Sequence, residues 1–174
     1  MVERFNLIAT SLRGQEPLAA TELGELLRSL GDENPSINMT RIAGLLTANT
    51  SLDPFNVIEQ VRTILEKEPW RISYLMRLIP IEEVVETRPE RVAEAVKKLA
   101  SKIPENATYR VTVEKRHTKL SSREIIEAAA SNVDRKVSLE NPEWIVLIEV
   151  LGGATGIAVI KPEQILSTTK QTNP

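Results

Sequence analysis

The first half of the chain alternates between strand-like and helix-like spacing of its hydrophobic residues. Residues 5–11 (FNLIATS) form an apolar run that is typical of a strand. Residues 16–30 then have apolar positions at helical spacing, with Pro17 in the first turn and Gly31 directly after the end. Residues 37–47 are again typical of a strand. The apolar face predicted for the helix consists of Leu18, Ala19, Leu23, Leu26, Leu27 and Leu30.

A second helix and a third strand complete this half. Asp53 and Pro54 are suited to be the N-cap and the first residue of a helix, which continues until Pro69 ends it. In residues 72–80, apolar side chains alternate with polar ones, as in a strand with one buried face. The predicted order over the first 80 residues is therefore strand, helix, strand, helix, strand.

The second half begins with a helix and a strand of its own. Residues 87–90 (TRPE) fit a capping box, and apolar residues follow at helical spacing as far as Ile103. Residues 109–114 alternate in the manner of a strand, with Tyr109, Val111 and Val113 toward the core. A second capping box at residues 121–124 (SSRE) predicts another helix. The inward side chains expected for it are Ile125, Ile126, Ala129 and Val133.

Two buried strands close the pattern. Residues 144–151 (WIVLIEVL) are nearly all apolar and residues 157–160 are entirely so, with a glycine-rich connection at residues 152–156. Helix and strand signals thus alternate along the chain and end in two adjacent strands, which we interpret as an α+β fold.

The chain is expected to form two small domains. Residues 80–87 lie between two turn signals and are the predicted junction. This gives a first domain over residues 1–80, a second over residues 81–167, and a polar tail over residues 168–174.

Composition excludes several kinds of chemistry. The chain has 174 residues, no cysteine and one histidine, which excludes disulfides, thiolate metal sites, cysteine nucleophiles and a metal site with two histidine ligands. No run approaches the ~18 apolar residues of a membrane span. We therefore expect a soluble, cytoplasmic protein that neither holds a metal nor enters a membrane.

The sequence also shows no convincing cofactor loop. Residues 151–156 (LGGATG) are flanked by strands on both sides, whereas the dinucleotide fingerprint leads from a strand into a helix. A hairpin turn explains these glycines better. The paired Glu82 and Glu83, beside Glu86, are typical of a solvated face. We expect no cofactor and no catalytic residues, and hence a protein that is not itself an enzyme.

Positive charge is concentrated in one segment. The whole chain has a formal net charge of −2, which argues against a protein that coats nucleic acid through its overall charge. Residues 110–136, in contrast, hold seven basic and four acidic residues. The densest part, residues 110–123 (RVTVEKRHTKLSSR), has five arginines and lysines against Glu114 alone. A chance run of charge on a solvated loop is the alternative interpretation.

The position of these basic residues favours a functional interpretation. They crowd the start of the helix predicted after Ser121, an end whose free amides and dipole normally favour acidic side chains. Local conflicts of this kind are expected mainly at functional sites. Free amides and cations together would hold phosphate groups. The cations concerned are Arg116, His117, Lys119 and Arg123, with Arg110 on the preceding strand as an extension.

A family resemblance then narrows the interpretation. The segment RVTVEKRHTKLSSREII, followed by VSLENPEWIVLIEVLGGATGIAVI, resembles the THUMP domain of RNA-modification proteins, and specifically the tRNA cytidine acetylation adaptor family. Residues 11–16 (SLRGQE) with the leucine-rich helix after them are similar to the ferredoxin-like domain that precedes THUMP in such proteins. The resemblance covers about residues 5–167. It implies an N-terminal ferredoxin-like domain followed by a THUMP domain with a mixed sheet and helices.

The resemblance also implies partners. The THUMP surface would take the 3′ acceptor end of a tRNA, and a separate tRNA acetyltransferase would form N4-acetylcytidine in that tRNA. The N-terminal domain would help to set the reach to the modified base. The RNA-binding role would fall on Arg110, Lys115, Arg116, His117, Lys119 and Arg123, together with the amides around Ser122.

Two other function classes stay open at this point. A stand-alone RNA-modifying transferase would bind acetyl-CoA and modify tRNA without help. An α+β interaction or ligand-binding module would show no salt-dependent affinity for tRNA.

Overall fold

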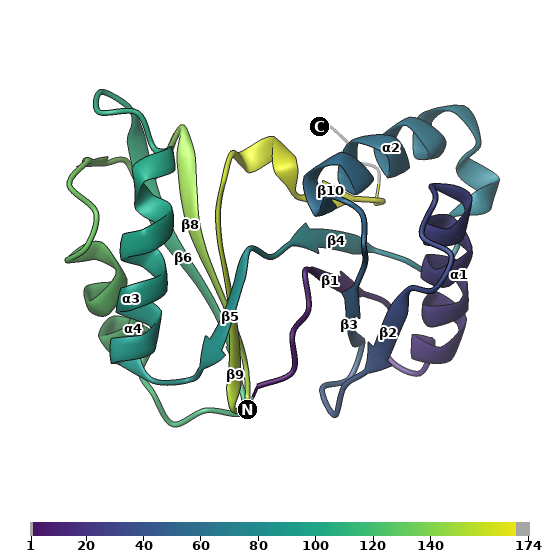
Figure 1. Ribbon diagram of the computed structural model, residues 1–174, viewed down its shortest axis with the longest axis horizontal. Helices are drawn as coiled ribbons and strands as arrows, with labels where there is room; N and C mark the ends of the chain where they lie inside the picture. The colour runs from purple at the N-terminus through teal and green to yellow at the C-terminus, as the bar shows by residue number, and fades with distance from the viewer. Residues whose placement is uncertain (1, 170–174) are drawn as a thin grey trace. The chain divides into compact units, whose positions relative to one another are not determined.

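The computed structural model describes residues 2–169, which fold into two compact units (Figure 1). One unit is formed by Phe5–Pro80 together with residues 163–169. The other is formed by Ile81–Pro162 together with residues 2–4. The main segment of the second unit, residues 81–162, therefore lies in the sequence between the two segments of the first unit.

The first unit is a four-stranded ferredoxin-like sheet with one added strand. The chain order of its elements is β-α-β-β-α-β and the sheet order is β10-β4-β1-β3-β2, with every pairing antiparallel. The ferredoxin-like expectation is thereby confirmed. The elements are β1 (Leu7–Thr10), α1 (Glu16–Ser29), β2 (Ser36–Met39), β3 (Leu45–Asn49), α2 (Pro54–Lys67), the 3-10 turn η1 (Pro69–Arg71), β4 (Arg77–Pro80) and β10 (Leu166–Ser167).

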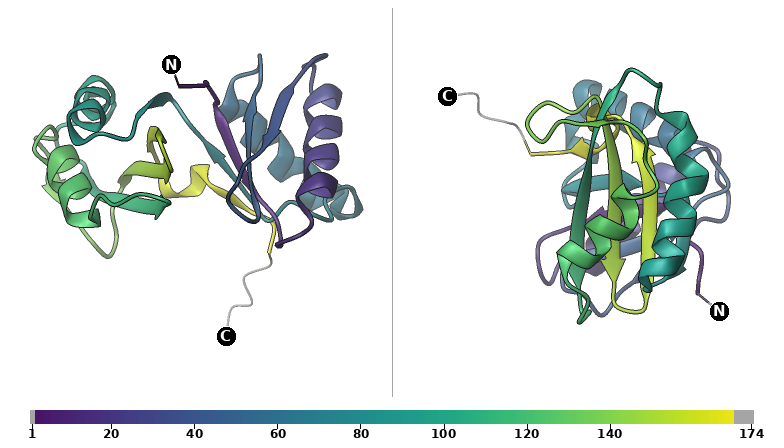
Figure 2. Two further views of the ribbon diagram at one scale, coloured as in Figure 1. Left: turned by 90° about the horizontal axis from the view of Figure 1, so that it is seen from below. Right: turned by 90° about the vertical axis from the view of Figure 1, so that its left-hand side faces the viewer.

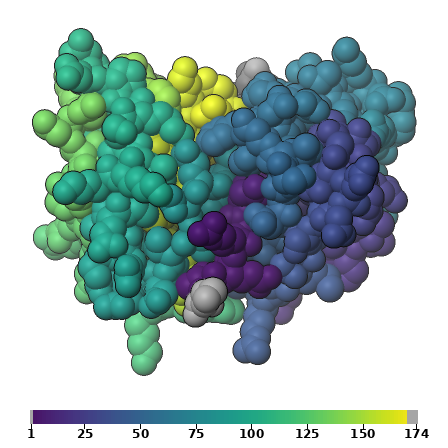
Figure 3. Space-filling view, in the orientation of Figure 1, coloured from purple at the N-terminus to yellow at the C-terminus, as the bar shows by residue number. Residues whose placement is uncertain are grey.

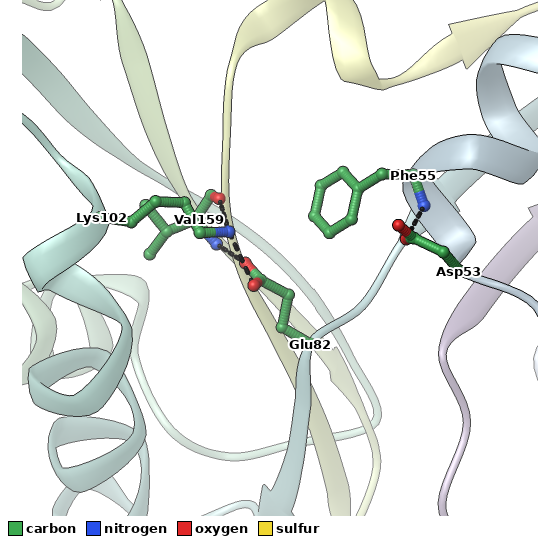
Figure 4. Close-up of polar contacts among 5 residues, drawn as sticks. All are labelled: Asp53, Phe55, Glu82, Lys102 and Val159. Carbon is green, nitrogen blue, oxygen red and sulfur yellow. Dashed lines mark hydrogen bonds and ion pairs between the residues drawn. The ribbon is translucent and has the colours of Figure 1, made fainter.

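Both helices of this unit pack on one face of the sheet (Figure 2). Buried leucines of α1 such as Leu23 and Leu27 meet Leu46 of β3 and Val61 of α2 in one apolar cluster. The N-cap predicted at Asp53 is confirmed, because its carboxylate accepts a hydrogen bond of 3.0 Å from the amide of Phe55 (Figure 4). Leu18, predicted on the inner face of α1, is instead 48% exposed.

The strand predicted over residues 37–47 is in fact a hairpin. Strands β2 and β3 pair in antiparallel register, and the chain reverses over residues 40–44. Gly44 ends this turn with φ +73°, and a Cβ there would lie 2.6 Å from the carbonyl oxygen of Ser11. Only glycine fits that position, so the single Gly44 permits the reversal that the apolar pattern concealed.

The strand predicted over residues 72–80 is shortened to β4. The carboxylate of Glu22, on α1, accepts hydrogen bonds from the amides of Ser73, Tyr74 and Leu75 at 2.6, 3.0 and 2.8 Å. These amides are therefore not available to a neighbouring strand. One buried acid on a helix thus overrides the alternating pattern of residues 73–75, and the chain rejoins the sheet at Met76, whose amide donates a hydrogen bond of 2.8 Å to the carbonyl of Thr10.

A buried carboxylate fixes the end of α1. Asp32 accepts hydrogen bonds from the Thr50 hydroxyl at 2.6 Å and from the amides of Ser51 and Asn34 at 3.1 Å each. Burial raises the pKa of Asp32, but these hydrogen bonds outweigh burial and hold the pKa below its ordinary value of 3.8. Since the folded state favours the ionised carboxyl, Asp32 stabilises the fold above pH ~4 and loses this effect as the pH falls through the lowered pKa.

Replacement of Asp32 by asparagine is expected to flatten the acid limb of the stability curve. The variant loses the charge-assisted hydrogen bonds, so its free energy of unfolding at pH 7 falls by about 1–3 kcal/mol. Below pH 3 the difference from the wild type shrinks. Urea denaturation from pH 7 to pH 2 measures both effects. A difference between the two proteins that stays constant over this range would contradict the role assigned to the carboxylate.

The second unit is a mixed five-stranded sheet with helices on one face. The sheet order is β5-β9-β8-β6-β7, in which β6 is parallel to both β8 and β7 and the other pairs are antiparallel. The elements are β5 (Glu83–Glu86), α3 (Pro89–Leu99), the 3-10 turn η2 (Ala100–Lys102), β6 (Thr108–Arg116), α4 (Ser122–Ala130), β7 (Lys136–Val137), β8 (Trp144–Leu151) and β9 (Ala154–Ile160), with the 3-10 turn η3 (Pro162–Gln164) after them.

The core of this unit lies between the sheet and helices α3 and α4. Val146, Ile148 and Val150 alternate along β8 and are fully buried there, and Tyr109, as predicted, joins them from β6. The outer side of α3 forms part of the surface of the unit (Figure 3). Ile126, expected to point inward from α4, is 38% exposed.

The segment expected to be the domain junction is largely part of this sheet. β5 pairs with β9, and the unit boundary falls between Pro80 and Ile81. The Glu82 carboxylate, expected to be solvated, accepts hydrogen bonds from the amide of Val159 at 2.8 Å and from Lys102 at 2.7 Å (Figure 4). It therefore anchors the chain at the start of the second unit.

The capping box predicted at residues 87–90 does not form. Arg88 occupies the N-cap position of α3 without a capping hydrogen bond from its side chain. The Thr87 hydroxyl instead lies 2.8 Å from the hydroxyl of Thr155 on β9. The Thr87 side chain thus connects the N-terminus of α3 to the sheet instead of capping the helix.

The described end of the chain, residues 163–169, returns to the first unit. β10 pairs with β4, and the Thr168 amide donates a hydrogen bond of 2.8 Å to the carbonyl of Met76. The structure therefore groups residues 163–167 with the ferredoxin-like sheet, whereas the sequence pattern placed them with the second domain. Residues 170–174 of the predicted polar tail lie outside the described residues.

Candidate nucleic-acid interface

The two helices of the second unit begin at the same edge of its sheet. β5, β6 and β8 run parallel to one another, so their last residues Glu86, Arg116 and Leu151 share that edge. Backbone hydrogen bonds join the connections there, from Gly152 to Arg116 at 2.9 Å and from Thr87 to Gly153 at 3.0 Å. The edge therefore gathers two helix N-termini and the β8–β9 turn (lower left in Figure 1).

The N-terminus of α4 has one capping hydrogen bond, and the first two amides of the helix remain available to a ligand. Ser121 is the N-cap, and its hydroxyl accepts a hydrogen bond of 3.1 Å from the amide of Glu124. The capping interaction predicted at residues 121–124 is thereby confirmed at Ser121. The amides of Ser122 and Arg123 have no acceptor inside the helix because of their position. They lie where an anionic group would find free N–H donors.

Residues 115–123, which we name the basic loop, run from the last two residues of β6 through the connection to the first turn of α4. His117 begins the turn with φ +55° and is the one non-glycine residue with positive φ among residues 2–169. Its side chain is exposed, and Gly152 of the neighbouring turn lies against it, since a Cβ on Gly152 would be 3.9 Å from the Cβ of His117. Left-handed backbone at a residue with a side chain occurs preferentially at binding sites.

Three cations of the basic loop are exposed to solvent. Lys115 donates a hydrogen bond of 3.2 Å to the carbonyl of Leu120, which draws the loop together. Arg123 pairs with Glu127 one turn along α4 at 2.9 Å, but its side chain is 88% exposed, so this ion pair is weak. Lys119 is exposed as well. These three side chains supply positive charge beside the free amides of α4.

Arg116 has a different environment from its neighbours in the loop. It is the last residue of β6, and its guanidinium donates a hydrogen bond of 2.6 Å to the carboxylate of Glu149 on β8. The Glu149 side chain is 0% exposed and that of Arg116 is 21% exposed. The charge of Arg116 is thus balanced inside the unit.

Arg110 does not lie with the basic loop. It stands six positions before Arg116 on the same strand, which separates the two by about 20 Å. Its guanidinium donates a hydrogen bond of 2.9 Å to the carbonyl of Leu139. Arg110 also lines an open cavity of about 420 Å³ with Asn141 and Pro142. The structure therefore gathers the predicted residues from Lys115 to Arg123 and leaves Arg110 at the far end of the sheet.

Arg88 is a cation at this edge that the sequence reasoning did not include. It precedes α3 and is about half exposed, with ion pairs to Glu90 at 2.6 Å and to Glu86 at 3.9 Å. The signal that could have identified it is the one used for α4, a basic residue at a helix start. The two acids offset its charge, so it adds little positive potential.

The described residues contain neither a candidate metal site nor a candidate membrane span. Within residues 2–169 there is no group of three or more histidine or acidic residues placed to hold a metal ion. No helix in this part of the chain is long and apolar enough to cross a membrane.

Comparison with known families assigns the second unit. Residues 86–160 match the family model of the THUMP domain, which confirms the THUMP domain expected from the sequence. The matched range contains the whole basic loop, the start of α3 with the preceding Thr87, and the β8–β9 turn. No curated protein matches the chain.

Solved structures share the fold of both units. PH1313 from Pyrococcus horikoshii Ot3 is 18% identical with a TM-score of 0.63, over 94% of this chain and 55% of its own. TrmN from Thermus thermophilus is 17% identical with a TM-score of 0.56, over 90% and 45%. A 4-thiouridine synthetase solved in complex with RNA and ATP is 13% identical with a TM-score of 0.55, over 94% and 42%. The chain thus spans about half the length of these structures.

Proposed function

We propose that this protein is a tRNA-binding adaptor, which presents tRNA to a separate acetyltransferase that forms N4-acetylcytidine. The THUMP domain match over residues 86–160 is the observation that carries the RNA-binding part of the proposal. The acetylation part rests on the resemblance of residues 110–126 and 137–160 to the cytidine acetylation adaptors. In this proposal the chain supplies no catalytic group and needs no cofactor of its own.

The basic loop suits the recognition of a single-stranded 3′ end. Such an end offers phosphates without a regular groove, so a protein binds it with cations, free amides and some stacking surface. Lys115, Lys119 and Arg123 provide the cations, and the first turn of α4 provides the amides. The exposed imidazole of His117 is the candidate for stacking or hydrogen bonding. This chemistry tolerates different tRNA sequences.

Positioning is the means by which the adaptor would act. A tRNA held by one protein that also holds the enzyme meets the active site at a raised effective concentration. The net charge of −2 fits modest affinity for tRNA without the enzyme.

Reconstitution tests the proposal. The full chain, the tRNA acetyltransferase of the same cells, acetyl-CoA, ATP and unmodified tRNA are mixed, and N4-acetylcytidine is measured by mass spectrometry of nucleosides. We expect little product when either protein is omitted and at least tenfold more when both are present. Product formed by this chain alone would instead identify a stand-alone transferase. An absence of salt-dependent tRNA binding would identify an interaction module without RNA.

A further inference from the structure

The first unit has an exposed aromatic surface far along the chain from the basic loop. Trp70, in the turn η1 after α2, is 72% exposed, and Leu18 on the first turn of α1 is 48% exposed. Between them lies a groove of about 370 Å³, to which Tyr74 and Leu26 also contribute. An exposed tryptophan beside an apolar groove is typical of sites that bind another molecule.

The groove has a structural cause that also sets its charge. The carboxylate of Glu22 binds the amides of Ser73, Tyr74 and Leu75, and so holds this segment along α1 instead of in the sheet. Glu22 lines the groove. The chain after η1 therefore forms one wall of the groove and α1 forms the other.

Glu25 gives the groove an unbalanced negative charge. It lies one turn after Glu22 on the same face of α1, is exposed, and makes no ion pair with the residues that the structure describes. The one basic side chain of the groove, Arg71, is bound to Glu68 at 3.0 Å. A ligand that fills the groove must therefore bring apolar surface and positive charge together.

We propose that this groove docks a segment of a partner protein in which an apolar side chain stands next to a lysine or arginine. The apolar side chain packs against Trp70 and Leu18, and the cation pairs with Glu25. Aromatic residues supply much of the binding energy at protein interfaces, and a complementary charge sets the orientation of the partner. The proposal holds whether or not the partner is the acetyltransferase.

The negative charge of the groove argues against two other ligands, RNA and a second copy of this chain. RNA phosphates would be repelled by Glu25, and no unpaired cation lines the groove among the described residues. A symmetric pair of two copies would place groove against groove, and so would bring two Glu25 carboxylates together. Both arrangements lack the charge complementarity that a protein segment with a cation provides.

Site-specific photo-crosslinking in cells tests the docking. The photoreactive residue p-benzoylphenylalanine replaces Trp70 in the full chain, and Met39, which is 57% exposed in the same unit, serves as the control position. We expect an adduct with one protein from the Trp70 position and not from the Met39 position. Mass spectrometry of the adduct should locate a lysine or arginine within about four residues of the linked site.

Charge exchange then separates specific docking from chance contact. Glu25→Arg is expected to reduce the adduct at least tenfold, whereas Glu33→Arg, the same change at another exposed acid of this unit, leaves it unchanged. Replacement of the partner's cation by glutamate should restore the adduct with Glu25→Arg. The affinity for tRNA should stay within twofold in both variants, which separates this inference from the RNA surface.

Several results would overturn the inference. They are an adduct with RNA, an adduct with a second copy of this chain, the same adduct at both positions, no adduct, or an adduct that Glu25→Arg leaves intact. None of these results bears on whether the basic loop binds tRNA. Conversely, loss of tRNA binding in the basic loop variants leaves the Trp70 adduct as a separate observation.

Discussion

Replacing Lys119 and Arg123 together by glutamate is expected to weaken tRNA binding by about 100-fold at 0.1 M salt. Each exposed cation lies beside the free amides of α4, so each change removes one phosphate contact and adds a repulsive charge. A charge-assisted contact contributes about 1.5 kcal/mol, which corresponds to about tenfold in affinity for each residue. A filter-binding titration with total tRNA measures the loss.

The salt dependence of binding identifies the cause of this loss. A single-stranded site loses about 0.7 from the slope of log affinity against log salt for each phosphate contact removed. The double variant should therefore flatten the slope by about 1.4. tRNA without its 3′ end should bind weakly to the wild type and show little further loss with the variant.

A matched control is available on the other helix of the same unit. Lys97→Glu makes the same charge change in the last turn of α3, away from the edge where both helices begin. It should leave tRNA affinity within twofold. The double variant should also keep its stability, because acids at a helix N-terminus gain ~0.3–1 kcal/mol from the dipole. Loss of stability with unchanged tRNA affinity would show that the basic loop is structural.

The helices α3 and α4 and the strands β6, β8 and β9 of the second unit were predictable because each one carries its own local signal, whereas β5 and β7 do not. β8 is an apolar run bounded by Pro142 and Gly152, and α4 begins at a serine with a glutamate three residues later. Local hydrogen bonds then form as the spacing predicts, as at Ser121. The same rule failed at Thr87, because Thr155 on β9 offers its hydroxyl a partner that no nearby sequence reveals.

The first unit shows what sequence spacing alone cannot provide. Residues 37–47 keep apolar side chains through the turn, so the reversal at Gly44 depends on its contact with the backbone of Ser11, far away in the chain. The departure of residues 73–75 from the sheet depends on Glu22, about fifty residues earlier. Both features arise from tertiary contacts.

The candidate site likewise combines features that local sequence predicts with features that depend on tertiary contacts. The cluster of exposed cations before α4 follows from charge counting and helix capping, both local properties. Arg110 and Arg116 look equivalent to their neighbours in composition, yet the first stands at the far end of β6 and the second is paired with a buried acid. Strand length and the position of Glu149 on β8 determine these environments. RNA binding by each of these residues stays a prediction.

Arg116→Met is expected to lower the free energy of unfolding by about 3 kcal/mol. The change takes the guanidinium away from Glu149, whose side chain is 0% exposed, and a buried ion pair that loses one partner typically costs 3–5 kcal/mol. Arg116→Met combined with Glu149→Leu should recover most of that loss, because two apolar side chains can replace a buried pair. Urea denaturation of the single and double variants measures the recovery.

A control and a second measurement assign Arg116 its role. Lys115→Met removes a charge from an exposed neighbour and should change stability by less than about 0.5 kcal/mol. Under conditions in which all variants are folded, the Arg116→Met and Glu149→Leu double variant should keep tRNA affinity within about threefold, because the pair carries no net charge. A stable Arg116→Met protein with at least tenfold weaker tRNA binding would instead make Arg116 part of the phosphate contacts. The pairing with Glu149 therefore predicts that the interface depends on Arg116 for its shape and on Lys119 and Arg123 for its charge.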